Sequence, residues 1–518
     1  MKILLPRSGI LAKIAGLPVS PTGRNLTLSS SQERCPILRK LSLLAIPLLA
    51  LITCVSQAQT LKALVNQAPD GAQLTFQLTD GTVMAQGYND YDWWKLTPDN
   101  TGSYLNGTWT QLASLPSGYE PEAFASAVLA DGRLLIEGGE YNFGNFTLTN
   151  LGATYNPKTN VWTPLQPPPG WSYIGDSPSS MLPNGDFLIG NKLVKNMAVL
   201  NPKTMVWIQG NPPGKADFNA EEGWTLMPDG TILTADVKDA PNSERFFPTL
   251  RKWETAGSTI VDLHSPSPFG CLNYGPNGQY CYYPPGEIGP AILRPDGTVF
   301  ATGSYSTAGP GHTAIYTPGA QLNNPGTWTV GPDFPNDDNA GDSFAVLLPN
   351  GDVLVEGLNT GVLYTWNGTT FTGGLNAEGQ SLMVLPTGQI LVGGTEIYTG
   401  TGTYSPSWAP AITSFPASVT PGSTYKISGT QFNGLSQANA FGDEYQTATN
   451  YPLVRITNNA SGHVFYAPTH NHSSMGVATG SAIVSTNFDV PAGIETGASS
   501  LVVVANGIPS VPVNITIN

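Results

Sequence analysis

The stretch SAVLADGRLLIEGG, residues 126–139, contains an apolar strand, a tight turn at Asp131-Gly132 and a second apolar strand. Asp-Gly tolerates the positive φ angles of a two-residue hairpin turn, and the flanking aliphatic residues suit a buried, pleated sheet. Six more stretches follow this pattern: residues 74–87, 179–191, 224–236, 291–303, 344–357 and 382–394. Their turn glycines recur every 37 to 67 residues, at Gly81, Gly132, Gly185, Gly230, Gly297, Gly351 and Gly388. Seven all-strand repeats of this size predict a seven-bladed β-propeller.

Outer strands are predicted by a second pattern, in which two aromatic or aliphatic residues stand seven positions apart around a turn-forming segment. The pairs are Tyr155 and Trp162, Leu200 and Trp207, Phe246 and Trp253, and Tyr364 and Phe371. They predict a third and a fourth strand in each blade. Tyr316 and Trp328 repeat the pattern with an insertion, the first repeat ends at Trp109, and the seventh is expected to end within residues 397–408. An irregular β-sandwich is the alternative, which the evenly phased hairpins disfavour.

The composition agrees with an all-β chain of two domains. Only 11% of the residues are charged, and the 518 residues include 58 Gly and 45 Pro, which is typical of many short strands joined by tight turns. After Trp408 the repeat stops, and alternating stretches such as residues 423–429 and 500–506 follow. We therefore predict the propeller over residues 60–408 and an immunoglobulin-like β-sandwich over residues 410–518.

The first 58 residues have the character of an export signal. Arg39 and Lys40 precede an apolar run at 41–52, and small residues before Gln59 offer a cleavage site. The apolar run is too short to span a membrane. This segment holds seven of the 22 basic residues and one of the 36 acidic residues, so its removal changes the net charge from −14 to −20. Such a surface repels nucleic acid and anionic membranes, and we expect a secreted, periplasmic or cell-surface protein.

Two cysteines remain after the predicted cleavage, Cys271 and Cys281, in the longest segment between repeats. In an oxidising compartment they are expected to form a disulfide, and two free thiols are the alternative. Tyr280 and Tyr282 belong to a tyrosine cluster in the same segment. Their rings either stack on sugar rings or pack the loop.

The Gly-Gly pairs after the second strand at 138–139 and 393–394, together with the Tyr-to-Trp spacing, resemble kelch repeats. A kelch propeller followed by this C-terminal domain resembles galactose oxidase and its relatives, over about residues 75–518. The resemblance implies that a loop of the C-terminal domain enters the propeller axis and supplies a metal-binding histidine, here His470. His472 faces the same side if the loop is extended, and an exposed loop is the alternative.

The copper site of that family is not expected in this chain. Where the resemblance implies a Tyr-His pair, the sequence has Glu378-Gly379. Both mature cysteines lie in one short loop, so neither is a convincing partner for the family's crosslinked tyrosine. Too few imidazole and phenolate donors remain to hold copper and its radical cofactor.

An acidic residue recurs eight to ten positions before most turn glycines. The set is Glu122, Asp176, Glu221 with Glu222, Glu287, Asp342 and Glu378. If the innermost strands begin together at one mouth of the channel, these carboxylates meet there. Close carboxylates raise each other's pKa unless a cation neutralises them, so we expect a hard cation such as calcium, or a cationic or polyhydroxylated ligand. The alternative is that these acids cap loops and solvate the rim.

These patterns predict a secreted binding module that holds a carbohydrate or a protein ligand at the propeller mouth. One alternative is an extracellular enzyme, either a divergent metal oxidase or a glycan-cleaving enzyme that uses two carboxylates. A structural or adhesive protein is the other. The sequence has no Ser-His-Asp or HExxH type of signature, which removes simpler hydrolases, and a fold alone does not choose among the rest.

Overall fold

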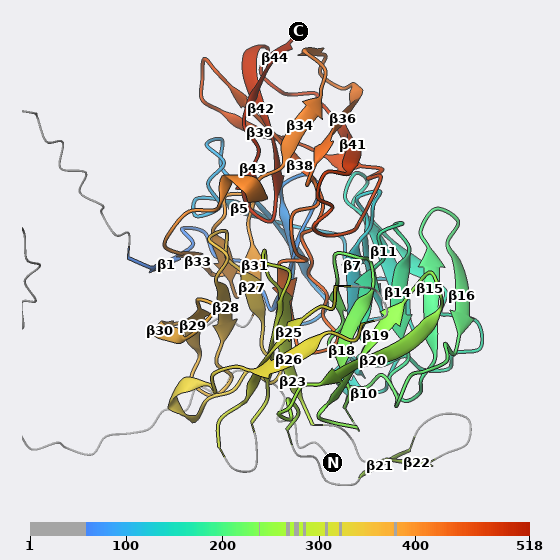
Figure 1. Ribbon diagram of the computed structural model, residues 1–518. Helices are drawn as coiled ribbons and strands as arrows, with labels where there is room; N and C mark the ends of the chain where they lie inside the picture. Colours follow the sequence, from blue (N-terminus) through green and yellow to red (C-terminus); the bar gives the residue numbers. More distant parts are fainter. Residues whose placement is uncertain are drawn as a thin grey trace, which may run out of the picture. The chain divides into compact units, whose positions relative to one another are not determined.

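Each predicted hairpin forms the two inner strands of an antiparallel sheet, and a third and a fourth strand complete each blade (Figure 1). Blades one to three consist of β2 (Leu74–Gln77), β3 (Val83–Gln86), β4 (Trp93–Thr97) and β5 (Thr108–Gln111); β7 (Ala125–Val128), β8 (Leu134–Glu137), β11 (Gly152–Asn156) and β12 (Val161–Leu165); and β13 (Ser179–Met181), β14 (Phe187–Gly190), β15 (Met197–Asn201) and β16 (Val206–Gly210). Blades four to six consist of β17 (Thr225–Leu226), β18 (Ile232–Ala235), β19 (Asn242–Phe247) and β20 (Lys252–Ser258); β23 (Ile288–Leu293), β24 (Val299–Gly303), β25 (Thr313–Thr317) and β26 (Thr327–Val330); and β27 (Ala345–Leu347), β28 (Val353–Glu356), β29 (Val362–Trp366) and β30 (Phe371–Asn376).

The structure is a computed structural model that describes residues 58–237, 239–265, 270–273, 279–282, 286–305, 309–320, 324–377 and 381–518. For residues 270–273 and 279–282 it describes the backbone alone. The predicted export signal lies outside these residues except for Ala58. In the described part of the chain, no helix has the length and apolar character that crossing a membrane requires.

The seventh blade is closed by the N-terminal strand. It consists of β31 (Leu382–Val384), β32 (Ile390–Val392), β33 (Glu396–Thr399) and β1 (Thr60–Ala63), with Thr60 opposite Thr399. The expected outer strand within residues 397–408 is therefore wrong, since Pro406–Trp408 form a short 3-10 helix, η2. Strand β1, from the N-terminal end of the propeller, forms the backbone hydrogen bonds at the edge of β33. This pairing holds the first and last parts of the propeller together without a covalent bond.

The innermost strands form a ring around the propeller axis. In the order β7, β13, β17, β23, β27, β31 and β2, each contacts the next. Blades one and two pack through Trp93 and Trp162, whose ring centroids are 5.1 Å apart. The predicted all-β propeller is confirmed.

In three of the four blades with the seven-residue spacing, the two spaced residues lie opposite each other in the outer strands. Tyr155 lies opposite Trp162, Leu200 opposite Trp207 and Phe246 opposite Trp253. In blade six the register differs, because Trp366 rather than Tyr364 lies opposite Phe371 and the pairing shifts between Leu363 and Tyr364. The turn between β29 and β30 spans residues 367–370, four residues as in blades two to four, so the pairing is displaced by two positions along β29.

The C-terminal strands form two further sheets, drawn in orange and red in Figure 1. The first contains β34 (Ala411–Ser414), β36 (Thr424–Thr430), β41 (Ile483–Asp489) and β40 (Thr469–His470). The second contains β35 (Ser418–Val419), β44 (Val513–Ile517), β42 (Gly497–Ala505), β38 (Leu453–Asn458) and β39 (Val464–Ala467). Side chains of both sheets share one buried core, including Ile427, Phe488, Val454 and Val503. This is a two-layer β domain, and its immunoglobulin-like character stays a prediction.

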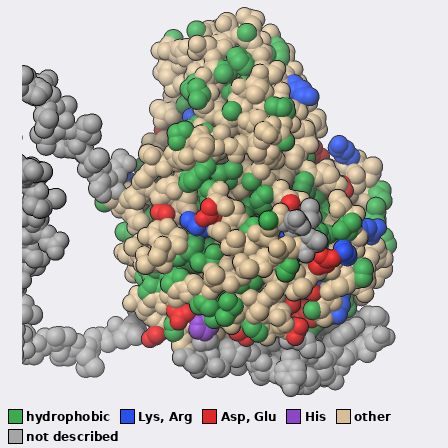
Figure 2. Space-filling view, in the orientation of Figure 1, with side chains coloured by type: hydrophobic (Ala, Val, Ile, Leu, Met, Phe, Trp, Pro, Cys, Tyr) green, Lys and Arg blue, Asp and Glu red, His purple; other side chains and the backbone are tan. Residues whose placement is uncertain are grey.

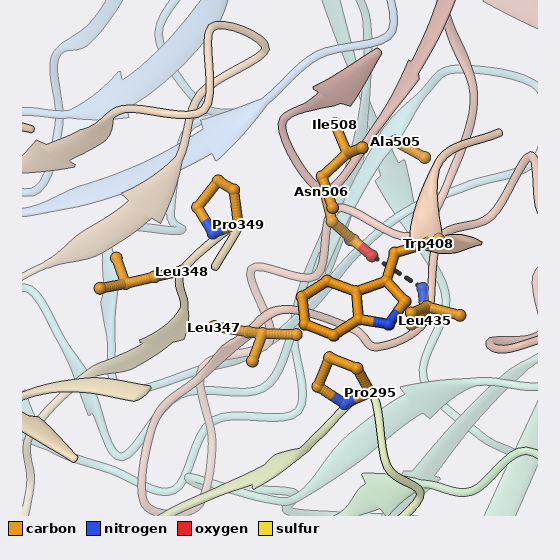
Figure 3. A pocket seen from close by; sticks show the side chains of 10 residues that line it. Pro295, Leu347, Leu348, Pro349, Trp408, Leu435, Ala505, Asn506 and Ile508 are labelled. Atoms are coloured by element: carbon orange, nitrogen blue, oxygen red, sulfur yellow. Dashed lines mark hydrogen bonds between the residues drawn. The ribbon is translucent and has the colours of Figure 1, made fainter. Parts of the chain in front are cut away.

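The C-terminal domain packs on the hairpin turns of the propeller. The Thr469 amide donates to the Thr79 carbonyl at 3.1 Å, beside the first turn. At blade six, Trp408 lies over the turn of Gly351, with Pro295 and Leu347 nearby (Figure 3). A Cβ at Gly351 would stand 2.8 Å from the Trp408 ring, and φ there is 90°, so glycine permits this approach.

One stretch of the C-terminal domain, residues 433–451, enters the propeller axis, and we call it the axial segment. Its short strand β37 (Asn439–Ala440) pairs with β27 and contacts β23 and β31. The Asn439 side chain accepts a hydrogen bond from the Val384 amide at 3.1 Å, and the Gln446 amide donates to the Ser126 hydroxyl at 3.1 Å. A loop of the C-terminal domain thus occupies the axis, as the resemblance implied, although the loop at 469–472 does not.

Candidate functional site

The axial segment carries two acids and a tyrosine to the mouth where the innermost strands begin. The Tyr445 hydroxyl accepts a hydrogen bond from the Ala123 amide at 2.8 Å, directly after the predicted site residue Glu122. The Tyr445 ring also packs edge-on against Phe124, with centroids 5.3 Å apart. These contacts place Asp443 and Glu444 among the acids that precede the innermost strands.

Three carboxylates from two domains meet at this point. One oxygen each of Asp176, Glu221 and Asp443 lies within 4.8 Å of the others, and all three residues are buried. Lys192, also buried, contacts the Asp176 carboxylate, approaches Glu221 Oε1 at 3.2 Å, and lies 3.8 Å from Glu140 Oε1. We call the three carboxylates with Lys192 the axial cluster.

Further acids surround the axial cluster and raise one another's pKa. Burial raises the pKa of Asp443 well above its usual range, and Glu444 and Glu221 beside it add to this effect. Burial also raises the pKa of Glu444 to about 7, with Asp342 as a further cause. Two carboxyl groups in hydrogen-bonding contact repel each other when both are ionised, so either they share a proton or a cation compensates their charge. The axial cluster is therefore suited to hold either.

The backbone is strained where two of these acids stand. Glu221 and Asp342 have φ angles of 55° and 52°, a left-handed conformation that is uncommon for residues other than glycine. Such strain is stabilised only by the surrounding structure and often accompanies functional sites. Glu221 joins the axial cluster, whereas its neighbour Glu222 does not.

Glu222 belongs instead to a second buried group in blade four. Lys215 Nζ contacts Glu222, lies 2.9 Å from Glu244 Oε2 and 3.3 Å from Asp217 Oδ1, and its side chain is 0% exposed. Asp217, Glu222 and Asp236 each place one oxygen within 4.8 Å of the others. We call these four carboxylates with Lys215 the blade-four cluster. Burial raises the pKa of Asp236 to about 8, with the neighbouring carboxylate of Glu244 as a further cause.

The predicted residue Glu122 lies at the rim between blades one and two, where it faces Asp90. Burial raises the pKa of Asp90 to about 8, and Glu122, which shares a hydrogen bond with it, is a further cause. The Asp90 carboxylate also accepts a hydrogen bond from Gln73. We call Asp90 and Glu122 the rim pair.

Exposed aromatic side chains stand on the two loops that hold the rim pair. Tyr88 and Tyr91, 53% and 46% exposed, flank Asp90 in the turn between β3 and β4. Phe143, 49% exposed, lies in the hairpin of β9 (Tyr141–Asn142) and β10 (Asn145–Phe146), and β9 pairs with β6 (Pro121–Glu122). The rim pair thus lies between two loops that present aromatic rings to solvent.

The remaining predicted mouth residues have different surroundings. Asp342 is half-buried, and its charge contributes to the raised pKa of Glu444. Glu287 is half-buried directly before β23, and its carbonyl accepts a hydrogen bond from the Ser265 amide. Glu378 lies outside the described residues. In Figure 2, most acidic side chains of the visible face lie on the propeller rather than on the C-terminal domain above it.

The predicted disulfide lies in a hairpin whose backbone alone is described. Strands β21 (Gly270–Asn273) and β22 (Gln279–Tyr282) pair antiparallel, with Cys271 opposite Cys281. The disulfide stays a prediction, because the side chains of both cysteines lie outside the described atoms. The same holds for the roles of Tyr280 and Tyr282.

His470 and His472 lie on the face of the propeller that carries the hairpin turns. His470 Nε2 is 3.0 Å from Asp489 Oδ1, and His472 Nδ1 is 2.9 Å from the Thr486 hydroxyl. Asn471 between them has φ of 54°, so the loop is not extended. Burial lowers the pKa of His472 to about 3. The axial cluster belongs to the opposite ends of the innermost strands, so these two histidines are not its neighbours.

Several site residues were missed in the sequence because they do not follow the repeat. Asp443, Glu444 and Tyr445 stand in the C-terminal domain, outside any blade pattern, although the run FGDEYQ concentrates acids and aromatic residues. Asp90 follows the second strand of its blade rather than preceding the first. Lys192 and Lys215 occupy loops, and no spacing rule distinguishes them from surface lysines.

No family model and no curated protein matches the sequence. Solved structures with a similar fold include a fungal alcohol oxidase of the AA5 family in complex with copper, at 12% identity and a TM-score of 0.49, covering 90% of this chain and 100% of that chain. A streptogramin B lyase is 13% identical with a TM-score of 0.43, covering 66% of this chain and 98% of that chain. The extracellular domain of a hybrid two-component system from B. thetaiotaomicron is 12% identical with a TM-score of 0.46, covering 89% of this chain and 59% of that chain. At these identities the likeness concerns the fold.

Proposed function

We propose that this protein is an extracellular carbohydrate-binding module whose ligand site lies at the propeller mouth, on the rim of blades one and two. The observation that carries the proposal is the rim pair, Asp90 and Glu122, flanked by the exposed rings of Tyr88, Tyr91 and Phe143. Sugar rings offer apolar C–H faces and hydroxyl groups at their edges. Aromatic faces and carboxyl oxygens are complementary to these two surfaces.

The protonation state of the rim pair supports recognition of a neutral polyhydroxylated ligand. Because the pKa of Asp90 is raised to about 8, its carboxyl group holds a proton at neutral pH. It therefore offers both a donor and acceptors to sugar hydroxyls. A polymer of anionic sugars fits less well, since the chain is strongly acidic and like charges repel.

Binding is favoured over cleavage at this pair. Glycoside-cleaving enzymes hold their two carboxyl groups about 5 to 5.5 Å apart when retaining and about 6.5 to 9.5 Å apart when inverting. Glu122 is close enough to Asp90 to raise its pKa, which favours a pair that shares a proton over two carboxyl groups set apart on either side of a glycosidic bond. A protein ligand stays the alternative occupant.

The test is binding of soluble neutral polysaccharides by affinity electrophoresis and calorimetry. We expect Tyr91→Ala and Glu122→Gln each to weaken binding about fivefold or more, because one stacking contact or one charged hydrogen bond contributes about 1 to 3 kcal/mol. Phe415→Ala is the matched control, since Phe415 is an exposed ring, 38% accessible, in the C-terminal domain. Equal binding by wild type, Tyr91→Ala and Glu122→Gln would reject the site, and release of reducing ends would favour the enzyme.

A further inference from the structure

An open apolar groove lies between blades three and four, which are neighbours in the propeller ring (Figure 1). Its volume is about 480 Å³, and sites for small organic molecules typically measure about 300 to 1,000 Å³. Apolar side chains of both blades line it, among them Leu188, Met197 and Ile208 of blade three and Phe246 and Phe247 of blade four. The rim pair is not part of this lining, so the groove is separate from the proposed carbohydrate site.

Blades three and four are joined differently from other neighbouring blades. At four other boundaries, an indole N–H of the outermost strand donates to a backbone carbonyl in or after the outermost strand of the preceding blade: Trp109 to Asn66, Trp162 to Ala113, Trp207 to Gln166 and Trp328 to Ala256. Trp253 of blade four donates instead to Met197 Sδ, at 3.2 Å. A methionine side chain is flexible and fills irregular spaces, so this part of the lining can adapt to a ligand.

The groove leaves large apolar side chains in contact with water. Ile208, in the lining, is 57% exposed. Leu250, which stands between the lining residues Thr249 and Arg251, is 60% exposed. A hydrocarbon group that covers these side chains removes apolar surface from water, which favours binding.

A cation at the outer end of the groove is free to bind an anion. Arg251, in the turn before β20, is exposed, and its guanidinium forms no ion pair or hydrogen bond with any described residue. Two acids of the lining, Asp186 and Asp229, stand in the inner hairpin turns and have partners of their own. Asp229 contacts Arg245, and Asp186 Oδ2 accepts a hydrogen bond from Asn184 Nδ2 at 2.8 Å. A carboxylate at the outer end would meet the planar donors of Arg251, while salt screens acids more than about 10 Å away.

We propose that this groove binds a small amphipathic carboxylate, such as a fatty acid of medium chain length. The hydrocarbon chain lies between the two blades, and the carboxylate lies against Arg251. A sugar fits this groove less well, because its hydroxyl groups would lose their hydrogen bonds to water beside Met197 and Phe246. The inference goes beyond carbohydrate binding and does not depend on it.

The test is calorimetric titration of the purified full chain with decanoate at about pH 7.5, below the concentration at which decanoate forms micelles. Decanol is the neutral ligand with the same chain length. Arg251→Gln should weaken decanoate binding about fivefold or more and change decanol binding less than about twofold, since only a carboxylate pairs with the guanidinium. Ile208→Ser should weaken both ligands about threefold or more, because apolar contact area is lost.

Each variant has a matched control on the same part of blade three. Val206 stands on the same strand as Ile208 and is 56% exposed, but it does not line the groove. Lys203 is an exposed cation in the turn before that strand and is not in the lining either. Val206→Ser and Lys203→Gln should leave the affinity for decanoate within about twofold, because salt and water screen groups outside the groove.

Four outcomes would overturn the proposal. The first two are no binding of decanoate by the wild type and an unchanged affinity in Arg251→Gln. The third is an equal loss in Val206→Ser and Ile208→Ser, which would mean adsorption to exposed apolar surface in general. The fourth is a dimer in light scattering that Ile208→Ser dissociates, because a second copy of the chain would then occupy the groove. All four replaced side chains are exposed, and near-ultraviolet circular dichroism checks that the variants keep their tertiary packing.

Discussion

Replacing Lys215 with methionine removes the cation of the blade-four cluster and preserves most of the side-chain volume. Lys215 Nζ contacts three carboxylates, those of Glu222, Glu244 and Asp217, and its side chain is 0% exposed. The ammonium also lies 5.0 Å from the ring centroid of Trp253. The change therefore removes the ammonium group that these buried carboxylates contact.

The expected loss is about 3 to 5 kcal/mol in the free energy of unfolding, the usual cost of removing one member of a buried ion pair. Lys158→Met is the matched control. Lys158 also pairs with a carboxylate, Asp489, but its side chain is 55% exposed. An exposed pair contributes about 0 to 1 kcal/mol, because water screens the interaction.

The assay is urea unfolding of both variants and the wild type at pH 8 and at pH 5. Burial raises the pKa of Glu222 well above its usual range, so its carboxyl and that of Asp236 are readily protonated at pH 5. We expect Lys215→Met to cost less at pH 5 than at pH 8. A loss no larger than that of Lys158→Met at pH 8, or an equal loss at both pH values, would refute the assignment of Lys215 as the essential counter-charge.

Two further predictions follow from single groups. The pKa of Asp236 is about 8 in the folded protein and near 3.8 in the unfolded chain, so between these values the folded state binds one more proton and its stability should fall as the pH rises. In Asp236→Asn, the urea midpoint should therefore change less steeply with pH over this range. Equal slopes in the variant and the wild type would contradict the argument that burial raises this pKa. For Cys271 and Cys281, intact mass after thiol labelling without reductant should show no label on either, and two labels would refute the disulfide.

The propeller could be predicted because its signals are local. A tight turn such as Asp131-Gly132 and the aliphatic residues beside it specify a hairpin within about 14 residues, whatever the rest of the chain does. Every residue of β7 and β8 is buried, as expected for a strand pair covered on both faces, and Tyr155 and Trp162, which marked the outer strands of this blade, lie opposite each other. The recurrence of acids before the innermost strands predicted that Asp176 and Glu221 lie close together at one mouth, as they do.

What could not be predicted depends on contacts between distant residues. Thr60 of β1 pairs with Thr399 of β33, because the unpaired edge of a sheet can bind any strand that reaches it. No local sequence pattern indicates which strand that is. Asp443 completes the axial cluster from a different domain, and the neighbours Glu221 and Glu222 belong to two different clusters. Turn chemistry and alternation act over a few residues, so sequence was enough for the hairpin of each blade, although not for the closing strand of the seventh. Charge pairing acts through space, so only the folded chain decided which carboxylates share a lysine or a proton.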